Sequence, residues 1–470
     1  MNLITNLTIF LLFPIILFSC KEKGSDRSVV DGKSVVDEKS VVDEKSVVDE
    51  KSVVDEKSVV DEKSVVDQKI EVPREEFEVQ YQIVLGASTT CVLSQASGSV
   101  KYWDRIPTGE AAIDSGIQEI IFTAAEAEEE VAKVEQLAVG EKHICILMDN
   151  EKVKCWGGNK AGQLGKFEKD LEDVSSDKSA YVDFGNELKV KQIATGHSSF
   201  HTCAILDNDK VKCWGNNNKG QLGIKDQAGV VDIKNRGDEK DEMGDKLPFV
   251  DLGEDNLAEK IAVGDHHTCA ILQNDKVKCW GSNDYEQLGI NSGDGYVDFG
   301  DRHAMELSLG FDKSCALLND GSVKCWGSNG MGFLGQSKED SSVNLGAGVK
   351  VKQISVGHTH ICALLDDDKV KCWGSNDNGE LGKANEMAVE SLAKMGDQLP
   401  IVDLGGEGAE EISLGYKRSC AVLTNEKIKC WGFANEEDQT SVVGVASIRG
   451  IVDEEDEMGD NFRDVDLGNW

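Results

Sequence analysis

The chain has 470 residues, of which 29% are charged and 40% apolar, and its formal net charge is -36 at pH 7. A chain of this length exceeds one compact core of ordinary size, which predicts several domains or a repeat architecture. The negative charge disfavours nucleic acid or an anionic membrane surface as the main partner, because phosphate binding needs clustered Lys and Arg.

The chain begins with an apolar run from Thr8 to Phe18, followed by Ser19 and Cys20. This run is shorter than the ~20 residues that a membrane-spanning helix needs, and it suits an export signal. A small residue before a lone Cys at this place resembles the lipobox of bacterial lipoproteins. The resemblance implies a lipoprotein signal peptide at 1–19, cleavage before Cys20 and lipid attached to Cys20. An ordinary secretory signal is the alternative.

Residues 20–75 form a predicted lipid-anchored tether, in which seven hexads of the type Ser-Val-Val-Asp-Glu-Lys occupy 28–69. Neither a helix nor a strand gathers these Val residues on one face, so the segment has little to bury. We therefore expect a disordered, low-complexity spacer whose role is reach. A short stacked β-solenoid is the alternative.

Residues 76–470 contain seven copies of one unit, and its clearest copy runs from Gly196 to Gly223. The first Cys of that copy, Cys203, recurs in the other units at spacings of 46 to 66 residues. A period of about 50 residues is typical of propellers and solenoids.

Each unit reads as a series of short strands joined by turns. In the clearest copy, residues 190–196 and 210–214 alternate in polarity, and residues 201–206 form a β-rich run. A further short strand, of the type Tyr-Val-Asp-Phe-Gly at 181–185, recurs between units. Four strands in each of seven units predict an all-β, seven-bladed β-propeller. The final strand, which starts at Val465, is expected to complete the blade opened at the N-terminus and close the ring.

The run His-Thr-Cys-Ala-Ile-Leu, followed by Val-Lys-Cys-Trp-Gly-x-Asn-x-x-Gly-Gln-Leu-Gly, resembles the regulator of chromosome condensation repeat over about 390 residues. Acidic inserts at 237–248 and 457–461 are similar to those of exported bacterial members. The resemblance implies a seven-bladed propeller that binds proteins. It does not imply nucleotide exchange on chromatin for an acidic, exported chain.

Six units hold two Cys residues ten positions apart. A three-residue hairpin loop with Gly321 in the left-handed position makes Cys315 oppose Cys325 across the strands. We therefore predict six cross-strand disulfides, with buried thiols or zinc as alternatives. The pairs are Cys145 and Cys155, Cys203 and Cys213, Cys269 and Cys279, Cys315 and Cys325, Cys362 and Cys372, and Cys420 and Cys430. Cys91 is expected to be a free, buried thiol because Tyr102 occupies its partner's place.

One Lys per unit precedes the second Cys or its replacement. In a ring these ammonium groups could hold an anion, and solvent-facing lysines are the alternative. The set is Lys101, Lys154, Lys212, Lys278, Lys324, Lys371 and Lys429.

Trp and His residues also recur near the paired Cys residues. One Trp per unit predicts packing between blades. His143, His197, His201, His266, His267, His358 and His360 precede the first Cys of their units. We expect hydrogen bonds at strand ends from them, with His358 and His360 as the best local pair for a metal. No metal, cofactor or catalytic residue is predicted.

Together these features predict a monomeric, lipid-anchored binding or scaffold propeller outside the cytosol. We expect it on the bacterial outer membrane or cell surface, or facing the periplasm. Its expected partner is a protein; a basic one would suit the acidic loops. The alternatives are a stoichiometric inhibitor or sensor of an exported enzyme and, less favoured, a propeller hydrolase. The first and last units, which lack the Gly-Gln-Leu-Gly ending, are the first candidate contact region; relaxed constraint at the ring seam is the alternative and the favoured interpretation.

Overall fold

The computed structural model describes twelve stretches of the chain, and the predicted signal peptide, Cys20 and the tether lie outside them. The described residues are 80–104, 117–120, 132–167, 180–226, 228–290, 295–329, 334–335, 342–383, 394–432, 458, 464–465 and 467. The helices among them are the 3-10 turns η1 (Gly244–Lys246) and η3 (Gly396–Gln398). Within these stretches no helix combines the length and apolar character needed to cross a membrane.

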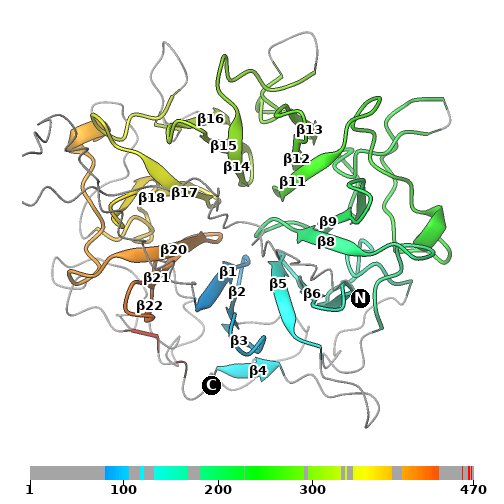
Figure 1. The fold of residues 1–470 in the computed structure, drawn as a ribbon, viewed down its shortest axis with the longest axis horizontal. Coiled ribbons are helices and arrows are strands. Elements are labelled where there is room, and N and C mark those ends of the chain that lie inside the picture. Colours follow the sequence, from blue (N-terminus) through cyan, green and yellow to red (C-terminus); the bar gives the residue numbers. More distant parts are fainter. Residues whose placement is uncertain are drawn as a thin grey trace, which may run out of the picture. The chain divides into compact units, whose positions relative to one another are not determined.

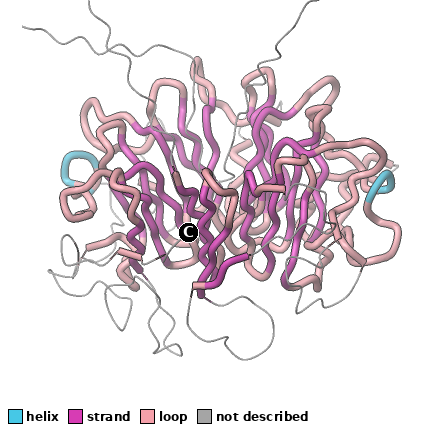
Figure 2. Tube along the Cα trace, turned by 60° about the horizontal axis from the view of Figure 1, so that its bottom comes forward, coloured by secondary structure: helices cyan, strands magenta, loops and turns pink. Residues whose placement is uncertain are grey.

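Seven antiparallel sheets surround one axis, which confirms the seven-bladed propeller (Figure 1). The strands nearest the axis are β1 (Tyr81–Leu85), β5 (Val134–Val139), β8 (Val190–Ala194), β11 (Ala258–Val263), β14 (Ala304–Leu309), β17 (Val351–Val356) and β20 (Ala409–Leu414). The middle strands are β2 (Thr89–Ser94), β6 (His143–Met148), β9 (His201–Leu206), β12 (His267–Leu272), β15 (Lys313–Leu318), β18 (His360–Leu365) and β21 (Arg418–Leu423). The third strands are β3 (Val100–Asp104), β7 (Val153–Gly157), β10 (Val211–Gly215), β13 (Val277–Gly281), β16 (Val323–Gly327), β19 (Val370–Gly374) and β22 (Ile428–Gly432). Figure 2 shows loops emerging at both ends of the strands.

Six of the seven sheets have three strands in the described residues, so the predicted short fourth strand does not form a ladder there. Among the described residues, the first blade is the one with a fourth strand, β4 (Gln118–Ile120). In the other blades the outer segment meets the third strand through an isolated bridge or a single backbone hydrogen bond, as where the Val182 N–H donates to the Val153 carbonyl at 2.8 Å. The next residue then turns the chain away, because Asp183 accepts the Gly185 N–H at 2.8 Å. An Asp that bonds the backbone two residues ahead ends a strand.

The last segment also differs from expectation. The Val465 N–H donates to the carbonyl of Ile428 in β22 at 2.7 Å, so this segment completes the seventh blade rather than the first. The two end blades pack directly on each other: Ile83 and Leu85 of the first blade share a buried apolar cluster with Val422 and Val465 of the seventh. The ring closes by the same packing that joins other neighbouring blades.

All six predicted disulfides are present, with Cα atoms 4.0 to 4.1 Å apart. Hairpin loops set this register: Gly321 has φ 80°, and Asp209 takes the equivalent place with φ 60°. Cys91 is buried and forms no disulfide, and it faces Tyr102 across β2 and β3. The register expected from the turn residues is therefore confirmed.

Neighbouring blades are joined by their Trp residues, as predicted. Four indoles donate to a carbonyl in the loop of the preceding blade; the Trp214 Nε1–H, for example, donates to the Gln163 carbonyl at 2.9 Å. Equivalent bonds join Trp280 to Gln221, Trp326 to Gln287 and Trp431 to Glu380. A buried indole needs a hydrogen-bond acceptor, and the recurring loop supplies one.

A second junction lies close to the axis. Except in the first blade, the innermost strand carries a register shift, and the residue after it points toward the next blade. Gln353 sits at this place: its Oε1 accepts the Ile412 N–H at 2.8 Å, and its Nε2 donates to the Ile412 carbonyl at 3.3 Å. Glu411 is the equivalent residue of the seventh blade, and its Oε1 accepts the Ile83 N–H at 2.8 Å.

Candidate functional site

The loops between the innermost and middle strands form a narrow ring around the axis. Each loop begins with a Gly that lies very close to the backbone of the loop in a neighbouring blade. A β-carbon placed on Gly310 would lie 2.5 Å from the Gly357 carbonyl oxygen, and one on Gly415 would lie 2.7 Å from the Gly86 carbonyl oxygen. Only glycine fits such an approach, so these loops bring the residues that follow the glycines together.

The residues after these glycines differ from blade to blade. They are Ala87, Glu141, His197, Asp265, Phe311, His358 and Tyr416. The third-blade loop holds four residues between Gly196 and His201, whereas the fourth-blade loop holds two between Gly264 and His267. The longer loop carries His197 across the axis, because its ring centroid lies 6.4 Å from that of His358, which comes from the sixth blade.

His197, Asp265 and His358 form one cluster of three ligand-type side chains, whose ligand atoms lie within 4.8 Å of one another. His197 Nε2 is 4.0 Å from Asp265 Oδ1, and His358 Nδ1 is 4.0 Å from Asp265 Oδ2. His197 and Asp265 are 1% and 3% exposed. His197 Nε2, Asp265 Oδ1 and His358 Nδ1 are buried without a hydrogen-bond partner, which is costly for polar atoms.

The electrostatics of this cluster keep the two imidazoles neutral. Burial lowers the pKa of His197 to about 3, and burial together with the Lys313 charge lowers the pKa of His358 to about 4. Burial raises the pKa of Asp265 to about 7, and the charges of Glu141 and Asp312 act in the same direction. A hydrogen bond from the Ser198 backbone N–H opposes that rise in pKa.

Aromatic rings and an ion pair surround the cluster. The His358 ring lies 4.7 Å from Phe311 and 4.4 Å from Tyr416, measured between centroids. The Lys313 ammonium bonds Asp312 at 2.6 Å and the His358 carbonyl at 3.2 Å. Two imidazole nitrogens and a carboxylate therefore converge in a site partly shielded from water, which is a donor set suited to a metal ion.

The recurring histidines fall into two groups. Four of them bond a hydroxyl of the next blade at 2.8 to 2.9 Å: His143 to Thr202, His201 to Thr268, His267 to Ser314 and His360 to Ser419. The expected hydrogen-bonding role is confirmed for these four.

The sequence pairing of His358 with His360 does not form a site, because His360 points to the seventh blade. Sequence analysis did not identify the cluster of His197, Asp265 and His358, although the greater length of the third-blade loop is visible in the sequence.

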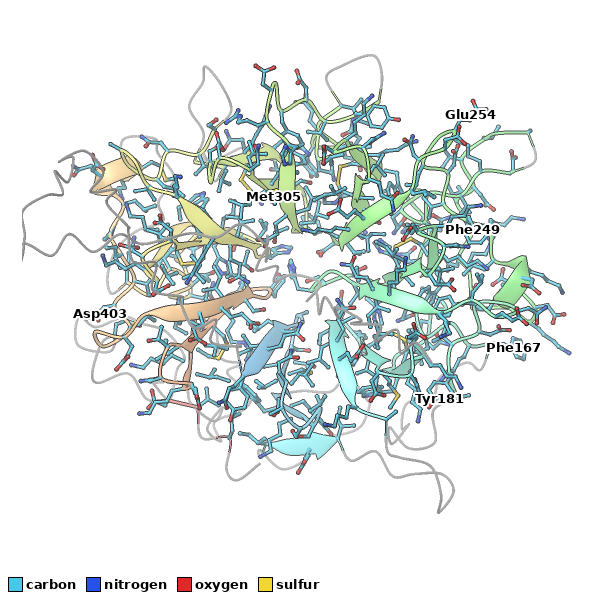
Figure 3. The ribbon with its side chains drawn as sticks, in the orientation of Figure 1. Phe167, Tyr181, Phe249, Glu254, Met305 and Asp403 are labelled. Atoms are coloured by element: carbon cyan, nitrogen blue, oxygen red, sulfur yellow. A yellow bond between two sulfur atoms is a disulfide. The ribbon has the colours of Figure 1, made fainter. Side chains whose placement is uncertain are left out.

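Five of the seven recurring lysines bind backbone carbonyls in the outer segment of the preceding blade. The Lys212 Nζ donates to the Phe184 carbonyl of the preceding blade and to the Gly244 carbonyl of its own blade's insert, both at 2.8 Å, and its side chain is buried. Equivalent bonds join Lys324 to Asp298, Lys371 to Leu345, Lys429 to Leu404 and Lys101 to Leu467. These lysines hold the outer segments, which lie at the rim where Figure 3 labels Tyr181, Phe249 and Asp403. Anion binding by the ring stays a prediction.

The insert of the third blade is the best-described irregular loop. Lys225 and Val231 form an isolated antiparallel β-bridge across a turn. Within that turn Asp226 Oδ1 accepts the Val230 N–H at 2.9 Å. Val230, Val231 and Ile233 are exposed on this insert. The distinctive endings of the first and seventh blades, at 105–116 and 433–450, lie outside the described residues.

Five segments match the model of the regulator of chromosome condensation (RCC1) repeat: 134–163, 190–221, 258–287, 297–332 and 351–380. The chain is 31% identical to protein pim1 of Schizosaccharomyces pombe over 171 residues, which are 36% of this chain and 29% of pim1. It is 27% identical to the human probable E3 ubiquitin-protein ligase HERC6 over 34% of this chain and 14% of that protein. The chain therefore spans less than a third of either relative.

Solved structures share the fold at low identity. Yeast RCC1 (Prp20), in a crystal structure with Kap60, superposes with a TM-score of 0.58 at 20% identity, over 83% of this chain and 86% of that one. Human WBSCR16 superposes with a TM-score of 0.56 at 19% identity, over 72% of this chain and 86% of that one. At these identities the likeness shows the propeller fold alone.

Proposed function

Because this chain is a propeller built from regulator of chromosome condensation repeats, we propose that it binds a protein partner outside the cytosol and that catalysis is not its role. The solved relative in complex with Kap60 supports the first part, since that propeller carries a protein partner. The observation that carries the proposal is the exposed third-blade insert on a rigid, disulfide-bonded ring. Loops held by a rigid scaffold are where proteins commonly place binding residues.

The disulfides support a location outside the cytosol. Six of the seven blades carry one, and each joins Cys residues only ten positions apart. Cytosolic reductants keep such thiols reduced, whereas exported proteins retain disulfides. The leader that ends at Cys20 adds a lipid anchor to this proposal, and residues 20–75 would give the propeller reach from the membrane.

The third-blade insert supports a specific contact surface. Val231 is 54% exposed and Ile233 is 63% exposed. Asp232 lies between them and pairs with Arg236, and the Arg236 backbone N–H donates to the Gly215 carbonyl of β10 at 3.1 Å, which attaches the insert to the ring. Apolar side chains inside a charged rim are typical of protein interfaces. We propose that this insert contributes apolar contacts and that neighbouring carboxylates favour a basic partner.

The contact is tested by affinity capture with the oxidised full-length chain as bait. Ile233→Asp should reduce the recovered partner at least tenfold, because a charge would be placed inside an apolar contact. Ile401→Asp is the matched control: Ile401 is 46% exposed but lies in the sixth blade. Equal recovery with both variants would exclude the insert, and no protein enriched above background would contradict the binding function.

The lipid anchor needs a separate test. Metabolic labelling with a fatty-acid analogue should mark the wild-type chain and leave Cys20→Ser unlabelled. Cys91→Ser is the matched control, since Cys91 is buried and forms no disulfide in the folded ring. Equal labelling of the wild type and Cys20→Ser would overturn the lipoprotein assignment without affecting the protein-binding proposal.

A further inference from the structure

We propose that His197, Asp265 and His358 bind one divalent transition-metal ion of the zinc class at the axis of the propeller. The ion would join loops from the third, fourth and sixth blades. This site is independent of the proposed protein contact, because it lies among the axial loops rather than on an insert.

The positions of the three side chains suit a small ion. Ligands of a tetrahedral metal with bonds of about 2.1 Å lie about 3.4 Å apart. The two measured separations from Asp265 to the histidines are each 4.0 Å, and the whole set lies within 4.8 Å. Small side-chain rotations are enough to close this set around an ion. The Asp265 carboxylate lies between the histidines and presents a different oxygen to each.

The unpaired atoms point to a ligand. His197 and Asp265 are almost completely buried, and the atoms that they turn toward each other have no hydrogen-bond partner. His358 Nδ1 is in the same condition. Leaving three buried polar atoms unpaired is costly, and one metal ion would satisfy all of them. A bound water could satisfy them in part, and the test below separates these two occupants.

The charges around the site favour a cation. Glu141, Asp265 and Asp312 act electrostatically on the site, and Lys313 is the positive group near them. Lys313 is paired with Asp312 at 2.6 Å, and the Lys142 charge acts on Glu141, so among the described residues Asp265 is the acid of the site whose close neighbours are the two neutral histidines. Both histidine ligands are neutral, as metal binding requires. The local charge therefore complements a divalent ion.

The ligand types select the class of metal. Calcium and magnesium prefer sites made of oxygen ligands, whereas imidazole suits zinc, copper, iron and nickel. Phe311 and Tyr416 flank His358 and shield one side of the cluster. Three protein ligands leave at least one coordination position for water or for a side chain of a binding partner.

The test is titration of the oxidised full-length chain with Zn²⁺, and with Co²⁺ followed by visible absorption. Millimolar Mg²⁺ should be present to occupy surface carboxylates. We expect one tight equivalent, with d–d bands typical of nitrogen and oxygen ligands. Asp265→Asn, His197→Ala and His358→Ala should each weaken binding at least 100-fold. His303→Ala is the control, because His303 precedes β14, outside the axial loops.

The outcomes are distinguishable. Binding that is absent, or that is unchanged in all three ligand variants, would overturn the site and leave water as its occupant. Zn²⁺ should also raise the thermal midpoint of the wild type but not of Asp265→Asn. Asp265→Asn keeps the shape of the side chain, so it decides the matter even if an alanine variant fails to fold.

Discussion

Replacing Glu411 by Gln should stabilise the ring at neutral pH and leave its stability unchanged in acid. Glu411 is fully buried at the junction of the seventh and first blades, where its Oε1 accepts the Ile83 N–H at 2.8 Å. At the equivalent junction, Gln353 both accepts from and donates to Ile412. An ionised carboxylate can only accept, whereas Gln at this place would also donate to the Ile83 carbonyl.

The pH dependence follows from the titration of Glu411. Burial raises its pKa well above the ordinary value, against the hydrogen bond from Ile83, and the Glu410 charge adds to the rise. The folded chain thus keeps this proton to a higher pH than the unfolded chain, whose Glu pKa is about 4.3. Stability linked to Glu411 is fully present below about pH 4 and is lost as the pH rises through the folded pKa.

The expected gain for Glu411→Gln is near zero at pH 4 and about 2 kcal/mol at pH 7, the cost of a buried polar group that lacks a partner. Denaturant unfolding followed by Trp fluorescence, with disulfides intact and chelator present, measures it between pH 4 and 8. Gln353→Glu is the reverse control and should lose a similar amount at pH 7 but not at pH 4. A gain independent of pH, or a loss of stability, would refute this assignment.

Three further substitutions test other parts of the ring. Tyr102→Cys should pair with Cys91, remove one reactive thiol from the denatured, unreduced chain and add at most ~3 kcal/mol; a persisting thiol would contradict the register. Gly310→Ala would push a methyl group against the Gly357 carbonyl and should cost ~2–3 kcal/mol in denaturant unfolding; a loss below ~0.5 kcal/mol would mean that the axial loops are loosely packed. Lys212→Met should cost about 2 kcal/mol by removing two buried charge-assisted hydrogen bonds. An unchanged unfolding midpoint would contradict the role of Lys212 in holding the outer segment.

The sequence alone determined the all-β class, the seven blades and the disulfides. Each unit repeats its own hairpin, and a turn with Gly321 at the left-handed position fixes which residues face each other. Local turn chemistry therefore sets the pairing of Cys315 with Cys325 without knowledge of the remaining fold. The Trp packing and the lack of a disulfide at Cys91 follow from the same register.

Tertiary structure alone decided which residues meet between blades. The recurring lysines looked like a ring, but five of them bond the outer segment of the preceding blade. Val465 completes the seventh blade, because it bonds the third strand there as the equivalent Val of each outer segment, for example Val182, does in other blades. His197, Asp265 and His358 are 68 and 93 residues apart in successive order. They meet because ring closure brings nonadjacent blades together at the axis and a two-residue extension of one loop spans it. No repeat in the sequence indicates that these three side chains lie close together.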